Sequence, residues 1–143
     1  MLPLALTPGE PAGIGPECVL RYRIHHPATP LVAVADPDLL RVTARQLDLD
    51  VAITPWEPGK PVARDPSNCA LSCLPVALAA PAVAGVLNPE NSAYVLATLR
   101  AATNLVQTGQ AAALVTGPYK ATLFGLTGKV NSGGFKGFSE GEV

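Results

Sequence analysis

Apolar residues along this chain gather into short, nearly continuous runs that are separated by longer segments of mixed polarity. Each run is four to six residues long, which suits a strand buried on both faces and is too short for a helix of ordinary length. Most runs end near proline, glycine, asparagine or aspartate, which favour turns. The pattern predicts five buried strands, at residues 2–6, 31–35, 51–54, 69–74 and 111–115.

Three of the intervening segments predict helices. Pro16 and Pro37 suit a first helical position, and Asp36 can cap the helix that begins at Pro37. In the third segment apolar side chains recur every three or four residues until Gly109, a common helix stop. The predicted helices cover residues 16–26, 37–47 and 89–108.

Two proline-rich segments interrupt this alternation. Residues 55–68 contain four prolines, one glycine and mixed charge, which predicts a surface connection that includes Trp56. Residues 75–85 are rich in alanine, valine and proline, and Pro81 interrupts any helical pattern. The second segment is therefore left unassigned.

Strands that alternate with helices predict an α/β fold with a mainly parallel sheet flanked by helices. In such sheets, ligands bind beyond the carboxyl ends of the strands. Two corners of similar composition lie at this edge. The first corner, residues 7–17, has three glycines and three prolines in eleven residues, and the second corner, residues 116–120, reads Thr-Gly-Pro-Tyr-Lys.

The composition fits one ordinary globular domain, with 143 residues, 48% hydrophobic residues and a formal net charge of −1. No lysine and arginine cluster forms the positive surface that binds nucleic acid or an anionic membrane, so neither partner is expected. No apolar run is long enough to span a membrane, and no charged and apolar leader precedes the first strand. We therefore expect a cytoplasmic protein.

Cysteine and histidine are too few and too poorly spaced for a predicted metal site. The three cysteines include no close pair at metal-ligand spacing, which predicts reduced thiols rather than disulfides or a zinc knuckle. His25 and His26 are adjacent, so on a helix they point in different directions and make a poor chelate. A Ser-His-Asp set is disfavoured for the same reason.

The first corner has two interpretations. Its glycines and prolines suit either a rigid loop whose backbone approaches a ligand or a tight turn that only joins strand to helix. Glu10 is either a general base or a carboxylate bonded to N–H groups of its own loop. In the second corner, Lys120 either meets a phosphate or carboxylate or lies exposed at a helix start.

The residue spacing excludes two nucleotide-binding motifs. A Rossmann fingerprint is excluded because Cys18 occupies the third glycine position. A Walker A loop is excluded because Val130 follows Gly128-Lys129.

Several segments, taken in order, carry a family resemblance. Residues 6–17 read Leu-Thr-Pro-Gly-Glu-Pro-Ala-Gly-Ile-Gly-Pro-Glu, and residues 74–78 read Leu-Pro-Val-Ala-Leu. Glu90-Asn91, with the Tyr-Val and Thr-Leu pairs that follow it, and Ala-Ala-Leu-Val-Thr-Gly-Pro at 112–118 complete the set. These segments, which cover roughly residues 2–120, resemble the amino-terminal part of the 4-hydroxythreonine-4-phosphate dehydrogenase family.

The resemblance implies an NAD(P)-dependent oxidation of the secondary alcohol of 4-phosphooxy-L-threonine, followed by decarboxylation, in pyridoxal phosphate biosynthesis. It also implies a fold similar to isocitrate and isopropylmalate dehydrogenases and a homodimer with a cleft between two α/β lobes. In that cleft a divalent metal held by three histidines polarises the reacting oxygen. On this resemblance, the cofactor and substrate cleft is lined by Thr7, Gly9, Glu10, Pro11, Gly13, Gly15, Thr116, Gly117, Pro118 and Lys120.

The chain also departs from this family. Family members are longer, and their metal-binding histidines and several substrate contacts lie in parts with no counterpart here. Their Gly-His-Thr-Glu segment has its nearest counterpart in Gly-Phe-Ser-Glu at 137–140, which leaves only Ser139 as a secondary substrate candidate. We expect residues 1–127 to form a partial dehydrogenase-like domain, with the second lobe incomplete or absent, and residues 128–143 to form a divergent glycine-rich tail.

We expect the 143-residue chain alone to be catalytically inactive. One alternative is a truncated remnant that serves as a ligand-binding or interaction module of the same fold. Another is a different α/β enzyme that uses the same corners to bind an anion.

Overall fold

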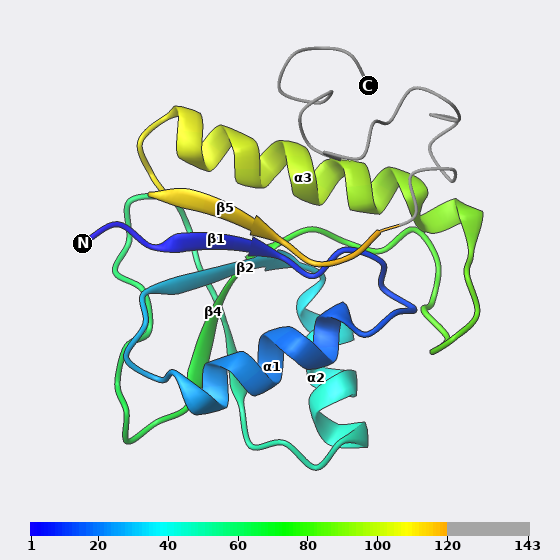
Figure 1. Ribbon diagram of the computed structural model, residues 1–143, viewed down its shortest axis with the longest axis horizontal. Coiled ribbons are helices and arrows are strands. Elements are labelled where there is room, and N and C mark those ends of the chain that lie inside the picture. Colours follow the sequence, from blue (N-terminus) through cyan, green and yellow to red (C-terminus); the bar gives the residue numbers. More distant parts are fainter. Residues whose placement is uncertain (120–143) are drawn as a thin grey trace.

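The computed structural model describes residues 1–119, in which helices cover both faces of a sheet (Figure 1). Helices α1 (Gly15–His25) and α2 (Pro37–Gln46) lie on one face, and α3 (Ser92–Gln107) lies on the other. Within these residues, no helix combines the length and the apolar character that a membrane crossing requires.

The sheet has five described strands in the order β3-β4-β2-β1-β5, and each neighbouring pair is parallel. This confirms the predicted α/β fold with a mainly parallel sheet flanked by helices. Because β1 lies between β2 and β5, the first and last described strands are neighbours. The strands are β1 (Leu4–Thr7), β2 (Leu31–Ala35), β3 (Ala52–Pro55), β4 (Ala70–Pro75) and β5 (Ala113–Thr116).

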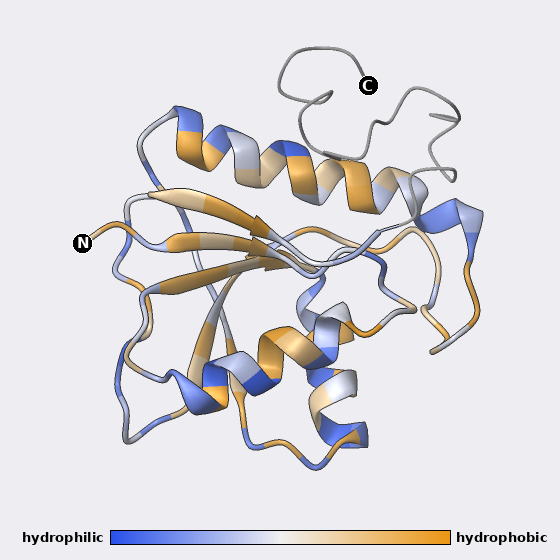
Figure 2. Ribbon diagram, in the orientation of Figure 1, coloured by the Kyte–Doolittle hydropathy of each residue, from blue (hydrophilic) through white to orange (hydrophobic). Residues whose placement is uncertain are grey.

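The central strand β2 shows how the sheet joins the two layers of helices. Leu31, Ala33 and Ala35 pack in the core on the side of α1 and α2, whereas Val32 and Val34 pack on the side of α3. All five residues are buried, which explains the continuous apolar run in the sequence. Figure 2 shows the strands as predominantly hydrophobic, between helices that carry both hydrophilic and hydrophobic residues.

The helices begin in different ways. Asp36 caps α2, as its position before Pro37 predicts, and Asn88 caps the short 3-10 turn η1 (Pro89–Asn91) that leads into α3. In contrast, Ile14 stands at the N-cap position of α1 and provides no side-chain hydrogen bond. The backbone at the start of α1 therefore depends on its surroundings rather than on a capping side chain.

The segment at residues 55–68 corrects one prediction. Trp56 is only 4% exposed and packs in the core beside α3, where its Nε1 donates a hydrogen bond to the carbonyl oxygen of Lys60 at 2.8 Å. The surface assignment was wrong for this residue, because an isolated aromatic in a proline-rich segment has no periodic partners that signal burial. The predicted boundaries of the five strands and of the first two helices otherwise agree with the structure to within two residues, whereas α3 begins three residues later than predicted, after the 3-10 turn η1.

A buried cation holds the same segment against α1. Arg23 is fully buried, and its guanidinium donates hydrogen bonds of 2.7 Å to the carbonyl oxygens of Thr29 and Ala63. Burial lowers the pKa of Arg23 from its usual range. We assign this arginine a structural role, because both of its hydrogen bonds are to backbone oxygens of neighbouring segments.

Candidate functional site

The predicted cleft residues lie at one edge of the sheet, where β1 and β5 both end (Figure 1). Thr7 and Thr116 are register partners at the last positions of these strands. Beyond them, the N–H of Gly117 donates to the carbonyl oxygen of Thr7 at 2.7 Å, and the N–H of Glu10 donates to that of Pro118 at 2.8 Å. The two corners therefore pack directly against each other.

Nine of the predicted residues are placed at this edge, and two are not described. Lys120 and Ser139 lie outside the described residues, so their predicted roles stay predictions. The nine are Thr7, Gly9, Glu10, Pro11, Gly13, Gly15, Thr116, Gly117 and Pro118.

Close packing requires three of the glycines, Gly15 within the first corner and Gly9 and Gly117 between the two corners. A Cβ atom on Gly15 would lie 1.6 Å from the carbonyl oxygen of Pro8, and one on Gly117 would lie 2.3 Å from the same oxygen. A Cβ atom on Gly9 would lie 2.2 Å from the carbonyl oxygen of Pro118, and Gly9 has a φ of +81°. These contacts support the tight-turn interpretation for the three glycines, and a role in ligand binding stays a prediction.

The carboxylate of Glu10 bonds within its own loop. Glu10 is 8% exposed, and its Oε1 accepts a hydrogen bond of 3.0 Å from the N–H of Ala12. Its carbonyl oxygen accepts another of 3.0 Å from the N–H of Gly13. The structure therefore shows one of the two uses that the sequence left open. The role of Glu10 as a general base stays a prediction.

The tip of the first corner is accessible to solvent. Gly13 is exposed, and a Cβ atom there would meet nothing closer than 3.4 Å. The neighbouring Ile14 is 60% exposed. Behind this tip, the carbonyl oxygen of Ala12 accepts a hydrogen bond of 2.8 Å from the N–H of Gly85. The first corner is thus fixed at its base and open at its tip.

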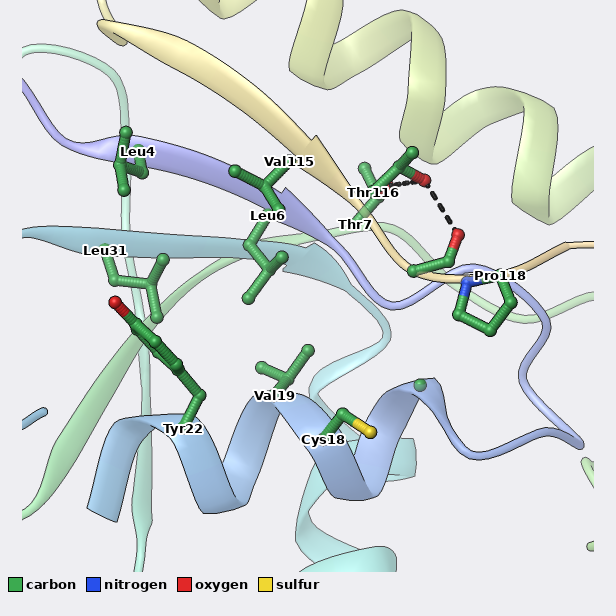
Figure 3. A pocket seen from close by; sticks show the side chains of 12 residues that line it. Leu4, Leu6, Thr7, Cys18, Val19, Tyr22, Leu31, Val115, Thr116 and Pro118 are labelled. Carbon is green, nitrogen blue, oxygen red and sulfur yellow. Dashed lines mark hydrogen bonds between the residues drawn. The ribbon is translucent and has the colours of Figure 1, made fainter. Parts of the chain in front are cut away.

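Two threonine hydroxyls join the ends of β1 and β5 (Figure 3). Thr7 Oγ1 donates to Thr116 Oγ1 at 2.8 Å, and Thr116 Oγ1 donates to the carbonyl oxygen of Gly117 at 3.0 Å. Thr7 is fully buried, whereas Thr116 is exposed. Of the two hydroxyls, only that of Thr116 is placed to meet a ligand.

Beside this pair, a hollow of about 340 Å³ opens between α1 and strands β1 and β5 (Figure 3). None of the described residues that line it carries a charged side chain. A phosphorylated ligand carries several charges that need partners. The described lining of the hollow therefore does not supply those partners. The apolar lining includes Leu4, Leu6, Val19, Tyr22 and Val115.

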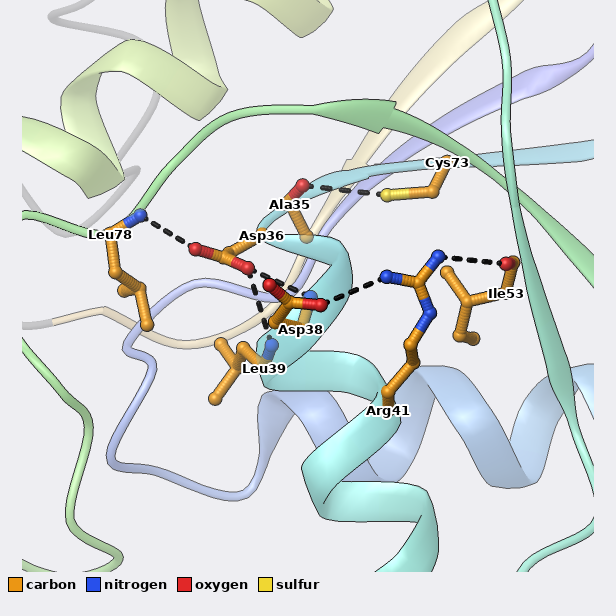
Figure 4. Close-up of polar contacts among 8 residues, drawn as sticks. All are labelled: Ala35, Asp36, Asp38, Leu39, Arg41, Ile53, Cys73 and Leu78. Carbon is orange, nitrogen blue, oxygen red and sulfur yellow. Dashed lines mark hydrogen bonds and ion pairs between the residues drawn. The ribbon is translucent and has the colours of Figure 1, made fainter.

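A neighbouring strand ends at a different kind of corner, which we call the Asp36 corner (residues 35–39; Figure 4). Oδ1 of Asp36 accepts hydrogen bonds from the N–H groups of Asp38 at 2.8 Å and Leu39 at 3.3 Å. Oδ2 accepts another from the N–H of Leu78 at 2.8 Å, and the N–H of Asp36 donates to the hydroxyl of Tyr94 at 3.0 Å. Both carboxylate oxygens and the N–H of Asp36 are therefore used in hydrogen bonds that hold the fold. The sequence predicted the cap but not the long-range contacts.

Two buried groups next to the Asp36 corner remain protonated near neutral pH. The thiol of Cys73 donates a hydrogen bond of 3.4 Å to the carbonyl oxygen of Ala35, and burial raises the pKa of Cys73 to about 12. Burial also raises the pKa of the Tyr94 hydroxyl. Neither group is suited to exchange a proton with a substrate at neutral pH.

The residues described here do not provide a metal centre. Among residues 1–119, no three or more histidine, cysteine, aspartate or glutamate side chains lie close enough together to hold an ion. The donor set therefore does not fit the divalent metal that the family resemblance implies. Any such ion would need ligands from elsewhere.

Residues 26–139 match the sequence model of a known family, the "Pyridoxal phosphate biosynthetic protein PdxA". This chain belongs to the PdxA family. The match confirms the predicted family resemblance, although it begins after the first corner. It extends past residue 127, and the predicted division of the chain at that residue stays a prediction.

Curated relatives agree with the PdxA assignment. The match to one of them covers 96% of this chain and therefore includes the first corner. The chain is 46% identical over 115 residues to the 4-hydroxythreonine-4-phosphate dehydrogenase of Serratia proteamaculans, which covers 80% of this chain and 34% of that protein. It is 38% identical over 137 residues to the enzyme of the same name from Saccharophagus degradans, covering 96% and 40% respectively. The chain therefore spans well under half the length of these PdxA relatives.

Solved structures support the PdxA fold. A crystal structure of a 4-hydroxythreonine-4-phosphate dehydrogenase from Burkholderia phymatum matches with a TM-score of 0.82 and 19% identity, covering 99% of this chain and 44% of that chain. A terephthalate 1,2-cis-dihydrodiol dehydrogenase from Burkholderia xenovorans matches with a TM-score of 0.70 and 26% identity, covering 99% and 40%. The fold of this chain thus matches a portion of each of these larger structures.

Proposed function

We propose that this chain contributes the amino-terminal wall of the active-site cleft of a 4-hydroxythreonine-4-phosphate dehydrogenase. The complete enzyme would oxidise the secondary alcohol of 4-phosphooxy-L-threonine with NAD or NADP, and the resulting β-keto acid would lose carbon dioxide. The observation that carries this proposal is membership of the PdxA family, with 46% identity to a relative of that name. The position of both corners supports it, because parallel sheets bind ligands at the carboxyl ends of their strands.

We assign the residues of the wall different roles. The Thr116 hydroxyl and the exposed backbone around Gly13 face the cleft, since both are accessible at the sheet edge. Lys120, in the second corner, supplies positive charge for the substrate phosphate. Gly9 and Gly117 shape the wall by permitting the two corners to pack together, and Gly15 does so by permitting the start of α1 to lie against Pro8.

The described residues supply only part of the site. The N–H groups of Glu10, Ala12, Gly13 and Gly117 are already bonded within the protein, so none of them is free to hold a dinucleotide pyrophosphate. The nicotinamide cofactor and the metal would be held mainly by the part of the family that has no counterpart here. We therefore expect the 143-residue chain alone to be inactive. On the family resemblance we expect the complete protein to be a homodimer, and we place it in the cytoplasm.

A second candidate function is a catalytically inactive module that retains the fold. One observation favours it: among residues 1–119, no three or more histidine, cysteine, aspartate or glutamate side chains lie close enough together to hold an ion. Such a module would bind a ligand or another protein through the same edge of the sheet.

A chimaeric enzyme tests the proposed function. Residues 1–119 of this chain would replace the matching part of the Serratia proteamaculans relative, and formation of NADH or NADPH would be followed with 4-phosphooxy-L-threonine and a divalent metal. We expect turnover that depends on the phosphorylated substrate and is absent with threonine. A chimaera that folds, as judged by circular dichroism, but reduces neither cofactor would refute the dehydrogenase role and favour the inactive module.

A further inference from the structure

The fully buried hydroxyl of Thr7 lies at the end of β1, beside the candidate site (Figure 3). Buried hydroxyl groups need hydrogen-bond partners, and among the described residues that of Thr7 bonds only Thr116 Oγ1, at 2.8 Å. Backbone pairing between β1 and β5 already holds the two strands in register. The side-chain bond therefore connects a buried group to the exposed hydroxyl at the edge of the sheet.

The two hydrogen bonds of Thr116 Oγ1 define which hydroxyl donates to which oxygen. A hydroxyl has one proton to donate and can accept two further bonds. Because a carbonyl oxygen can only accept, the Thr116 proton points to the carbonyl oxygen of Gly117, at 3.0 Å. Thr116 Oγ1 therefore accepts from Thr7, whose proton has no other acceptor among the described residues. The Thr116 proton can thus turn to another oxygen without breaking the bond from Thr7.

We propose that Thr7 is a positioning residue, which holds the Thr116 hydroxyl so that its proton is donated to a phosphate oxygen of the substrate. This inference rests on the proposed function, in which the second corner receives the substrate phosphate. In the bound state, the phosphate oxygen replaces the carbonyl oxygen of Gly117 as the acceptor, and the bond from Thr7 persists. A hydrogen bond to a charged oxygen is stronger than one to a carbonyl oxygen, which favours this exchange.

A double-mutant cycle in the chimaeric enzyme tests the proposal, with folding of each variant checked by circular dichroism. Thr116→Val should raise the KM for 4-phosphooxy-L-threonine about tenfold, because one hydrogen bond to a charged group is lost. Thr7→Val should raise this KM about fivefold by itself but less than about twofold beside Thr116→Val, because Thr7 acts only through that hydroxyl. Thr7→Ser keeps the donor and should bring the KM back to within about twofold of wild type.

Thr98→Val is the matched control for the loss of a buried hydroxyl. Thr98 is 1% exposed, and its Oγ1 donates to the carbonyl oxygen of Val95 within α3 at 2.7 Å. This variant should change the KM less than about twofold, because its hydroxyl lies outside the candidate site. Equal increases for Thr7→Val and Thr98→Val, or a full Thr7→Val effect beside Thr116→Val, would overturn the proposal.

Two further outcomes separate this inference from the proposed function. Turnover of the phosphorylated substrate that neither Thr7→Val nor Thr116→Val alters would overturn the positioning role and leave the proposed function standing. A folded wild-type chimaera without turnover would refute the proposed function, and this inference with it.

NMR of the complete 143-residue chain tests the positioning without a substrate. Three-bond couplings at Thr116 report its χ1 angle, and we expect one staggered rotamer in wild type and in Thr7→Ser. Thr7→Val should give couplings averaged over several rotamers, because the bond that holds the oxygen is lost. The Thr116 methyl signal should respond to inorganic phosphate. An unchanged single rotamer in Thr7→Val, or a response to threonine but not to phosphate, would overturn the proposal.

Discussion

The first corner and the Asp36 corner both connect a strand to a helix at the same edge of the sheet, but they do so by different means. At the Asp36 corner, one carboxylate pairs three N–H groups, and two of these belong to its own helix. At the first corner, no side chain caps α1, and the corner packs on the backbone of Gly117 and Pro118. The comparison shows that one corner is specified mainly by its own sequence and the other by a segment about 100 residues away, since Thr7 and Thr116 are 109 residues apart.

This difference has a functional consequence. The Asp36 corner devotes its carboxylate and N–H to structure and is flanked by the protonated, buried Cys73 and Tyr94. The first and second corners instead present an exposed hydroxyl at Thr116 and an exposed loop tip at Gly13. Ligand binding is therefore expected at the corner whose glycines bring two loops together, and not at the corner closed by a side chain.

The largest effect is expected from Gly15→Ala. Its Cβ atom would lie 1.6 Å from the carbonyl oxygen of Pro8, so the start of α1 would have to move away from the end of β1 within the first corner. We expect a loss of about 3 kcal/mol in the free energy of unfolding, measured by urea denaturation. Gly13→Ala is the matched control, because its nearest contact is 3.4 Å away, and it should cost less than about 1 kcal/mol. If both variants lost the same free energy of unfolding, the contact between the start of α1 and Pro8 would not require a glycine at position 15.

A smaller loss is expected from Asp36→Ala. The substitution leaves the first turn of α2 without its cap and the N–H of Leu78 without its partner. We expect about 2 kcal/mol of destabilisation by urea denaturation. Asp36→Asn should cost less, because the amide oxygen can still cap α2 while the NH₂ group cannot accept from Leu78. If the alanine variant were as stable as wild type, the Asp36 corner would not depend on its carboxylate.

The smallest effect at neutral pH concerns the cysteines beside the two corners. Cys18 is exposed near the first corner, whereas Cys73 is buried beside the Asp36 corner. Alkylation at pH 7 should modify Cys18 readily and leave Cys73 unmodified until the protein unfolds, because a buried thiol with a pKa of about 12 forms little thiolate. Mass spectrometry of the modified protein measures both sites. Rapid modification of Cys73 under native conditions would contradict the closed state of the Asp36 corner.

The burial of Cys73 should also make the free energy of unfolding depend on pH in the alkaline range. Because folding raises the pKa of Cys73 from 9.0 to about 12, its contribution is fully present below pH 9 and is lost as pH rises toward 12. The raised pKa of Tyr94 acts in the same direction. Unfolding free energies across this range should therefore fall less steeply in Cys73→Ala than in wild type. Parallel curves for the two proteins would show that Cys73 does not titrate differently on unfolding.

Much of the fold could be predicted from the sequence because its determinants are local. The apolar runs predict the five strands to within two residues, and Asp36 before Pro37 predicts the start of α2. The order of the strands and the burial of Trp56 depend on contacts between distant segments, which periodicity does not report.

The residues of the candidate site could be predicted from the sequence, but the contacts among them could not. The strand-end positions of both corners place them at one edge, and the family resemblance picks out the same residues. The sequence cannot show that Gly15 and Gly117 both face the carbonyl oxygen of Pro8, or that the Glu10 carboxylate bonds to its own loop. These features depend on the three-dimensional path of the loops, which the spacing of residues in the sequence does not report.

The most direct test of the central claim is an NMR titration of the complete, isotope-labelled chain with 4-phosphooxy-L-threonine. Millimolar ligand allows detection even though the described part supplies only one wall of the cleft. The account predicts chemical-shift changes at the amides of the non-proline residues among 9–15 and at that of Gly117, with none at Asp36, Asp38 or Leu39, and no response to unphosphorylated threonine. Changes centred on residues 36–39, or no change at either corner, would contradict the claim that the two packed corners form the substrate-binding wall.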